Sequence, residues 1–301
     1  MATLLSLIHI SEAVFVIDVV ANKIKISTPT GEYSLSGEAA KEYPEVPEFV
    51  ATATTTLDSS ILRKIVHRTA FAVSSDELRP SMMGILLQAN GTEIRAVATD
   101  GHRLSRFLYK PENGAKLAKD VIVPAKALGI LVKGLETGPC TVSTSNTHVK
   151  FTYDQTVLTS RLIEETYPNY EVVIPKENNR FLTIKREDLI NAIRRVSLFA
   201  NASNHQVRFD LAPNSLKLSA QDADAGGEAR ETLQAVYDAE PMEIGFNATY
   251  LVDILSHIDG EQVIMKFSAP TRAGIVSPAD SPETEDTLML IMPVRLTVPE
   301  H

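Results

Sequence analysis

The stretch ATDGHRLS, residues 98–105, carries the strongest indication of the fold in this sequence. An Asp-Gly pair stands between a run of small residues and a basic His-Arg pair, which is typical of a tight turn between two strands. Asp100 and His102 are two residues apart, so on a strand their side chains point to the same side. The stretch is therefore a catalytic pair, part of a metal site, or a hairpin corner that shapes a surface.

An internal repeat surrounds this stretch. Two proline-marked segments, residues 41–56 and 164–181, each follow strand-like sequence and precede a helical pattern. Each helix is followed by short strands, a second helix and more strands, and corresponding elements lie about 125 residues apart. Such a unit is an α+β domain. We predict a partial domain at residues 1–50 and two whole domains at residues 51–176 and 177–301.

Four amphipathic helices are expected in the two whole domains, within residues 57–74, 123–136, 185–204 and 246–259. The first helix of each whole domain is apolar on one face and basic on the other. These faces are either simply solvated or, as the family resemblance given below implies, attract DNA phosphate without reading bases. Two basic faces in one acidic protein favour the second interpretation. The candidate DNA-facing residues are Arg63, Lys64, Arg68, Arg79, Lys126, Lys133, Arg186, Arg194 and Arg195.

The composition is that of an acidic globular protein. The 301 residues carry a formal net charge of −9 and are 44% hydrophobic, enough for a substantial core. Cys140 is the single cysteine, which favours a reducing, cytoplasmic setting and a buried thiol. The apolar first segment contains His9, Glu12 and Asp18, which argues against a signal peptide or a membrane span.

Catalytic motifs are missing from the sequence. It contains no G-x-S-x-G, H-E-x-x-H or P-loop motif, and its seven histidines lack ligand spacing. We therefore expect no metal, no cofactor and no enzymatic activity. A hydrolase that uses Asp100 and His102 stays as a remote alternative, because such an enzyme also needs a nucleophile, an oxyanion site or a full metal set.

Several motifs together resemble the bacterial sliding clamp family, the beta subunits of DNA polymerase III. The motifs are ATDGHRLS (98–105), R-P-x-M-x-G-I (79–85), VIVP (121–124), TYPNYEVVIP (166–175), MEIGFNATYLVD (242–253) and IMPVRL (291–296). The resemblance implies three similar domains per chain and a head-to-tail homodimeric ring, with helices around duplex DNA and sheets outside. It also implies a cytoplasmic, non-catalytic processivity factor for DNA replication.

The resemblance further implies a pocket for partner peptides between the second and third domains. Polymerase subunits, the clamp loader and repair proteins would enter it with a Gln-x-x-Leu-Phe-like peptide. Leu104, Val173 and Val294 are expected to bury the apolar pair, while Met82 and Met292 supply adaptable surface. The implied pocket residues are Met82, Thr99, Gly101, His102, Arg103, Leu104, Pro168, Val173, Tyr250, Met292, Pro293, Val294, Arg295 and Leu296.

The start of the sequence departs from the family pattern. Residues 1–50 match only the second half of a first domain, and a half domain leaves sheet edges and apolar surface exposed. This predicts a chain that binds partner peptides but does not close a ring. The tail at residues 297–301 extends beyond the family's usual Arg-Leu end and is expected to point to solvent.

Overall fold

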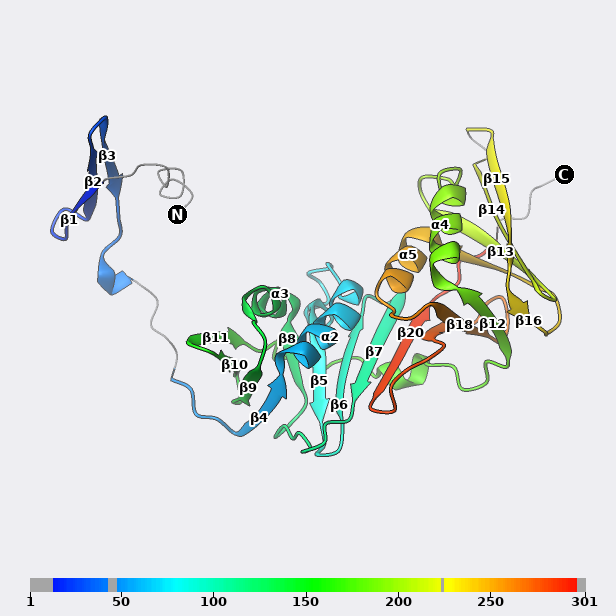
Figure 1. The fold of residues 1–301 in the computed structure, drawn as a ribbon, viewed down its shortest axis with the longest axis horizontal. Helices are drawn as coiled ribbons and strands as arrows, with labels where there is room; N and C mark the ends of the chain where they lie inside the picture. Colours follow the sequence, from blue (N-terminus) through cyan, green and yellow to red (C-terminus); the bar gives the residue numbers. More distant parts are fainter. Residues whose placement is uncertain (1–12, 43–47, 223–224, 297–301) are drawn as a thin grey trace. The chain divides into compact units, whose positions relative to one another are not determined.

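The computed structural model describes residues 13–42, 48–222 and 225–296, and the chain separates into two units, Met1–Phe49 and Val50–His301 (Figure 1). The first unit contains an antiparallel sheet of β1 (Val14–Asp18), β2 (Lys23–Thr28) and β3 (Gly31–Ser36), followed by the 3-10 helix η1 (Ala40–Glu42). Residues 1–12, the start of the predicted partial domain, lie outside the described residues.

The first unit has almost no core of its own. Ile26, 1% exposed, is the one fully buried side chain among its described residues. All five residues of β1 are exposed, including Phe15 at 57% and Ile17 at 66%. A three-stranded sheet needs a buried apolar face or a helix against it for independent stability. The described part of this unit supplies neither.

The larger unit contains the same series of elements twice. Each half runs strand, helix, several strands, helix and three more strands, which is the α+β repeat expected from the sequence. The first half consists of β4 (Ala53–Asp58), α2 (Ser59–Thr69), η2 (Ala70–Ala72), η3 (Pro80–Met83), β5 (Gly84–Ala89), β6 (Ile94–Thr99), β7 (Arg103–Tyr109), β8 (Val121–Pro124), α3 (Ala125–Gly134), β9 (Pro139–Thr144), β10 (His148–Tyr153) and β11 (Thr156–Arg161).

The second half follows a strap over residues 163–174, which includes the 3-10 helix η4 (Tyr170–Val173). Its elements are β12 (Arg180–Lys185), α4 (Arg186–Ser197), β13 (Gln206–Ala212), β14 (Ser215–Asp222), β15 (Gly227–Gln234), β16 (Val236–Tyr237), β17 (Met242–Asn247), α5 (Ala248–Ser256), β18 (Gln262–Phe267), β19 (Gly274–Pro278) and β20 (Glu285–Ile291).

Local sequence explains where these helices begin and which face they bury. The side chain of Asp58 accepts a hydrogen bond from the backbone N–H of Ser60 at 2.8 Å and so caps α2. Asn247 caps α5 in the same way. Ile65 in α2 and Ile193 in α4 are at most 2% exposed, as the helical periodicity predicts.

One sheet joins the two halves of the larger unit. Its nine strands follow the order β16-β12-β18-β19-β20-β7-β6-β5-β8, so β20 of the second half pairs with β7 of the first. The pair is antiparallel, and Ile291 stands opposite Arg103. Figure 1 shows these two strands side by side, with α2 and α3 over one half and α4 and α5 over the other. The β7–β20 pair is therefore the joint between the repeats.

Three apolar clusters fill this unit. Each half has its own large core under its helices, and Cys140 lies in the first of these, where burial raises the pKa of its thiol to about 11. The third cluster lies on the opposite face of the nine-stranded sheet. Leu86 and Val97 belong to it, whereas their neighbours Ile85 and Ala96 belong to the helix-side core. The strap covers this outer cluster.

Candidate functional site

The ATDGHRLS turn is a hairpin corner, which is the third of the three interpretations that the sequence allowed. Asp100 Oδ1 accepts hydrogen bonds from the backbone N–H groups of His102 and Arg103, at 2.8 and 2.9 Å. Thr99 Oγ1 donates to the Arg103 carbonyl and accepts from the Gly101 N–H. Gly101 has a φ of +91°, a conformation that favours glycine. The Asp100 carboxylate thus holds backbone N–H groups rather than orienting the His102 ring for catalysis.

The C-terminal segment closes against this corner. The Met292 N–H donates to the His102 carbonyl at 2.9 Å, which continues the β7–β20 ladder by one bond. The Val294 N–H then donates to the Gly245 carbonyl, also at 2.9 Å. A Cβ on Gly245 would lie 2.8 Å from Leu296, so this glycine lets the segment approach β17 closely. The two most specific motifs of the sequence therefore meet in space.

The exposed and half-buried residues of this region form a group that we call the junction surface: His102, Tyr250, Met292, Pro293 and Val294. The rings of His102 and Tyr250 stack with their centroids 5.7 Å apart. Met292 is 42% exposed, and Tyr250, Pro293 and Val294 are half-buried. An apolar and aromatic surface of this kind, next to exposed Gly101, fits an extended peptide with apolar side chains.

Four of the implied pocket residues are buried instead: Met82, Thr99, Arg103 and Leu104. The prediction that Leu104 contacts a partner directly is wrong for this structure. Leu104 is 1% exposed, because it belongs to the outer cluster that the strap covers. Arg103 is 9% exposed and points into the joint between the repeats. These four residues therefore belong to the interior of the fold beside the junction surface.

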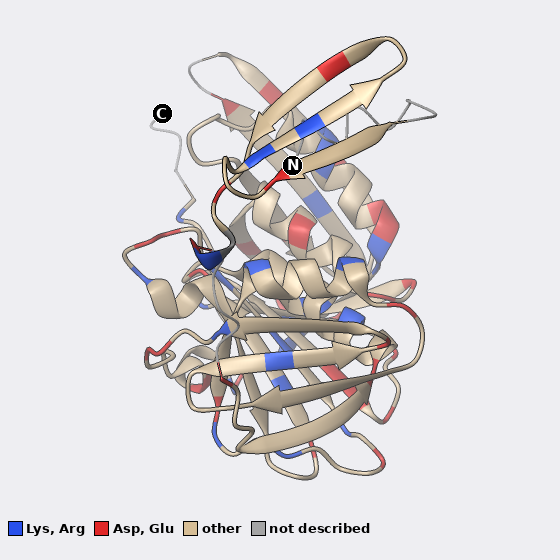
Figure 2. Cartoon of the chain, turned by 90° about the vertical axis from the view of Figure 1, so that its left-hand side faces the viewer, with Lys and Arg blue, Asp and Glu red and all other residues tan. Residues whose placement is uncertain are grey.

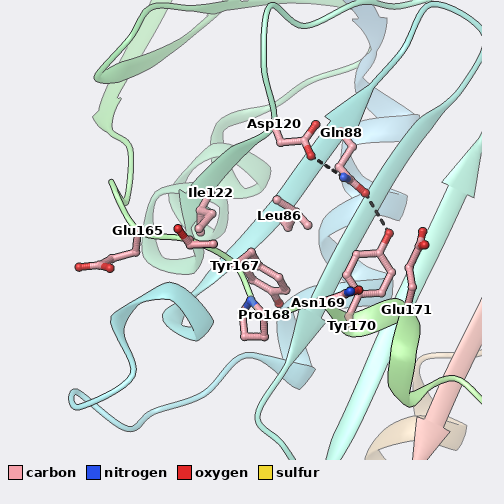
Figure 3. A pocket seen from close by; sticks show the side chains of 11 residues that line it. Leu86, Gln88, Asp120, Ile122, Glu165, Tyr167, Pro168, Asn169, Tyr170 and Glu171 are labelled. Atoms are coloured by element: carbon pink, nitrogen blue, oxygen red, sulfur yellow. Dashed lines mark hydrogen bonds between the residues drawn. The ribbon is translucent and has the colours of Figure 1, made fainter.

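Pro168 and Val173 lie on the strap, and both are exposed. Beside Pro168 the strap borders a cleft of about 490 Å³, with Leu86 and Ile122 among its apolar lining residues (Figure 3). Within the cleft, Tyr170 Oη donates to Gln88 Oε1 at 2.9 Å. The cleft shares only Pro168 with the implied pocket residues. We therefore infer that the hydrogen bond between Tyr170 and Gln88 anchors the strap on the sheet.

Besides Arg195, which is paired with Glu231, the α-helices carry three exposed cations, Lys126 and Lys133 on α3 and Arg194 on α4. The ion pairs of the described residues do not include any of them. Basic and acidic positions both occur throughout the chain, with basic ones on the helices (Figure 2). These three residues are therefore the basic side chains of the helices that remain available to an anion.

The other predicted basic residues already bind parts of the protein. Arg63 donates to carbonyl groups that follow α3, and Arg186 donates to the carbonyl groups of Leu255 in α5 and of Gly260. Lys64 pairs with Glu285, and Arg195 forms two hydrogen bonds with Glu231. Lys64 and Arg195 keep part of their exposure, but the carboxylates of Glu285 and Glu231 partly neutralise their charge.

The DNA-facing prediction is wrong for Arg68, while that for the exposed Arg79 stays a prediction. Arg68 is 4% exposed rather than on an open helix face, because its guanidinium binds the His257 carbonyl and the Asp259 carboxylate of the second half. Arg79 lies in the loop before η3, not on a helix. It pairs with Asp76 and stands beside the ATDGHRLS turn.

A histidine pair lies next to Arg68 at the joint. The rings of His67 and His257 are 4.8 Å apart, and His257 also stacks on Phe71. Burial lowers the pKa of His67, and the positive charges of His257 and Arg68 lower it further, while Asp259 opposes them. The folded protein therefore disfavours a protonated His67.

This shift predicts acid sensitivity at the joint. A folded-state pKa below the unfolded value means that the unfolded chain takes up the proton first, so stability is lost as pH falls through about 6.5. We expect His67→Gln to lose less thermal stability than the wild type between about pH 7.5 and pH 5.5. Melting curves at the two pH values measure this; equal losses in both proteins contradict it.

The described residues contain no cluster of three or more His, Cys, Asp or Glu side chains that could hold a metal ion. No helix among the described residues is long and apolar enough to cross a membrane.

Comparison with known proteins finds relatives over most of the chain. The family model for the central domain of the DNA polymerase III beta subunit matches residues 56–169, and the model for its C-terminal domain matches residues 171–295. The beta sliding clamp of Pseudomonas aeruginosa is 30% identical over 276 residues, which cover 91% of this chain and 74% of the relative. That of Vibrio cholerae is 28% identical and covers 94% and 77%.

Solved structures agree with these relatives. A sliding clamp from Bartonella birtlesii bound to griselimycin superposes with a TM-score of 0.87 at 29% identity, over 94% of this chain and 76% of that one. A DNA polymerase III beta subunit from Pseudomonas aeruginosa gives 0.86 at 30% identity, over 95% and 77%. The repeated fold, the two motifs that meet at the joint and these matches lead to one conclusion: the chain belongs to the beta sliding clamp family, the non-catalytic processivity factors of DNA polymerase III.

Proposed function

We propose that this chain holds partner proteins at the junction surface and duplex DNA along its helices. The partners are polymerase subunits, the clamp loader and repair proteins that carry a Gln-x-x-Leu-Phe-like peptide. The observation that carries the proposal is the meeting of the ATDGHRLS turn with residues 292–296 through the β7–β20 pair. In this arrangement Val173 and Val294 supply apolar contact, and Arg295 is exposed at the edge.

The chemistry of the surface suits several partners. Met292 is unbranched and polarizable, so it adapts to different apolar side chains. The stacked rings of His102 and Tyr250 offer a firm edge with polar atoms for a glutamine side chain. Two relatives have been solved with griselimycin bound, from Bartonella birtlesii and Pseudomonas aeruginosa. We propose that griselimycin also binds this chain, at the junction surface.

A peptide titration tests the docking proposal. A fluorescent peptide with the Gln-x-x-Leu-Phe motif should bind saturably, as measured by fluorescence polarisation, and unlabelled griselimycin should displace it. A scrambled peptide of the same composition is the control. Binding of both peptides with equal affinity, or no displacement by griselimycin, contradicts the proposal.

The DNA contact is proposed to be electrostatic and independent of sequence. Lys126, Lys133 and Arg194 are exposed on helices, and flexible cations attract phosphate without reading bases. A sliding protein needs attraction of this kind, because specific base contacts would hold it in place. The 6% aromatic content also disfavours binding by base stacking.

The assembly remains a prediction. The family resemblance implies a homodimeric ring, but the first unit has a single fully buried residue among those described and an exposed apolar β1. We expect the chain with this first unit to stay monomeric, near its 32.9 kDa chain mass, in light scattering at micromolar concentration. A discrete dimer that is retained on circular DNA and released when the DNA is cut contradicts the expectation.

Two further statements belong to this proposal. We propose the domain boundaries 1–50, 51–176 and 177–301, which limited proteolysis can test at the two proline-marked segments. We also propose a cytoplasmic location, which fractionation of cells that express the chain can test.

A further inference from the structure

We infer that Arg103 is a positioning residue that ties the junction surface to the joint between the two repeats. Its guanidinium donates to three acceptors from different parts of the fold. Nε donates to Asp100 Oδ2 at 3.1 Å, Nη1 to Asp253 Oδ2 at 2.5 Å and Nη2 to the Phe71 carbonyl at 2.8 Å. These groups come from the ATDGHRLS turn, from α5 and from η2. The inference concerns the peptide affinity of this surface and so rests on the proposed function.

The same guanidinium lies close to two aromatic rings. Its central carbon is 5.3 Å from the centroid of the Phe71 ring and 4.8 Å from that of Tyr250. Phe71 belongs to the first repeat and Tyr250 to the second, so these two cation–π contacts come from both sides of the joint. A planar guanidinium satisfies three acceptors and stacks on rings at once, whereas a lysine ammonium offers a single compact charge.

Tyr250 connects this arrangement to the junction surface. Its ring meets Arg103 and also stacks on His102 at 5.7 Å, while Arg103 itself is 9% exposed. A docked peptide would therefore touch His102 and Tyr250, and Arg103 would act through them. Ion pairs to Asp100 and Asp253 hold the turn and α5 at a set separation. The positions of the His102 and Tyr250 rings thus depend on one buried cation.

A second buried arginine provides a matched control. Arg68 also crosses the joint from the first repeat, to the His257 carbonyl and the Asp259 carboxylate, and is 4% exposed. It makes no ring contact with Tyr250 or His102 among the interactions of the described residues. A change of the Arg68 side chain therefore weakens the joint but leaves Arg103 in contact with Tyr250 and with the turn that carries His102.

The experiment compares Arg103→Lys with Arg68→Lys, which both keep the charge. Peptide affinity is measured by fluorescence polarisation and the melting temperature by calorimetry. We expect Arg103→Lys to weaken the peptide about tenfold and Arg68→Lys to change it less than about twofold, while both lower the melting temperature. Equal weakening by the two variants overturns the inference, since the effect then comes from the joint as a whole. An Arg103→Lys affinity within about twofold of wild type overturns it as well.

Two further measurements separate this inference from the proposed function. In a Tyr250→Ala background, Arg103→Lys should weaken the peptide less than it does in the wild type, because only its support of His102 then remains; a full additional loss overturns the inference. NMR spectra without peptide should show shifted ring signals of His102 and Tyr250 in Arg103→Lys but not in Arg68→Lys. If the wild type binds no peptide, the proposed function fails, and these ring signals still decide the role of Arg103.

Discussion

Replacing both Val173 and Met292 by aspartate lowers the affinity for the Gln-x-x-Leu-Phe peptide by about a hundredfold or more. The two side chains are 50% and 42% exposed, so the fold tolerates a charge at either position. In the complex each would bury apolar surface against the peptide, worth roughly 1.5–3 kcal/mol per side chain. A carboxylate at the same place has to be desolvated without a partner.

The matched control for this variant is Val157→Asp with Leu198→Asp. These two residues are 60% and 82% exposed, and they lie on β11 and after α4. The control adds the same charge and removes similar apolar surface elsewhere. Peptide affinity should stay close to that of the wild type, and melting curves should show both variants folded. If the control weakens the peptide as much as the test variant, net charge explains the loss and Val173 and Met292 do not line the docking site.

Reversing three helix cations removes most of the attraction to duplex DNA. In the variant Lys126→Glu, Lys133→Glu, Arg194→Glu, each change deletes a cation that can pair with phosphate and adds repulsion. The slope of log K against log salt concentration should become shallower by about 0.9 for each phosphate that is no longer neutralised. Affinities for a short duplex, measured from low to moderate salt, give this slope directly. The weakening should be the same for unrelated duplex sequences.

A control variant with the same change in net charge tests whether DNA binding depends on the position of the cations on the helices. The variant Lys110→Glu, Lys116→Glu, Arg161→Glu changes the net charge by the same amount at exposed residues outside the helices. Its salt slope should remain close to that of the wild type. An equal reduction of slope in the two variants would falsify the helix surface as the place where DNA binds, because general repulsion would then account for the change.

Local sequence was sufficient to predict the elements of the repeat and the shape of the turn. The predicted helices are present, and Asp58 and Asn247, whose side chains are of types that favour N-caps, cap two of them. Asp100 and Gly101 are the residues that a corner needs, and they make it with short-range hydrogen bonds. These features depend on interactions over a few residues, which a sequence displays directly.

The sequence did not predict which side chains on those elements are covered by distant segments. Arg68 falls on the polar face of its helix, yet it is buried because Asp259 and the His257 carbonyl approach from a segment about 190 residues away. Leu104 directly follows the turn and was expected to line the peptide pocket, yet the strap covers it. A helical periodicity identifies faces, but it does not tell which distant segment covers a face.

The amino-acid sequence by itself determined the α+β repeat, the positions of its helices and the identity of the two motifs. Only the tertiary structure decided that the motifs form one surface and that Arg103 supports it from below. The physical reason is the pairing of β20 with β7, which sets Ile291 opposite Arg103. Strand edges offer similar hydrogen-bonding groups along their length, so partner and register come from packing across the whole sheet rather than from either motif.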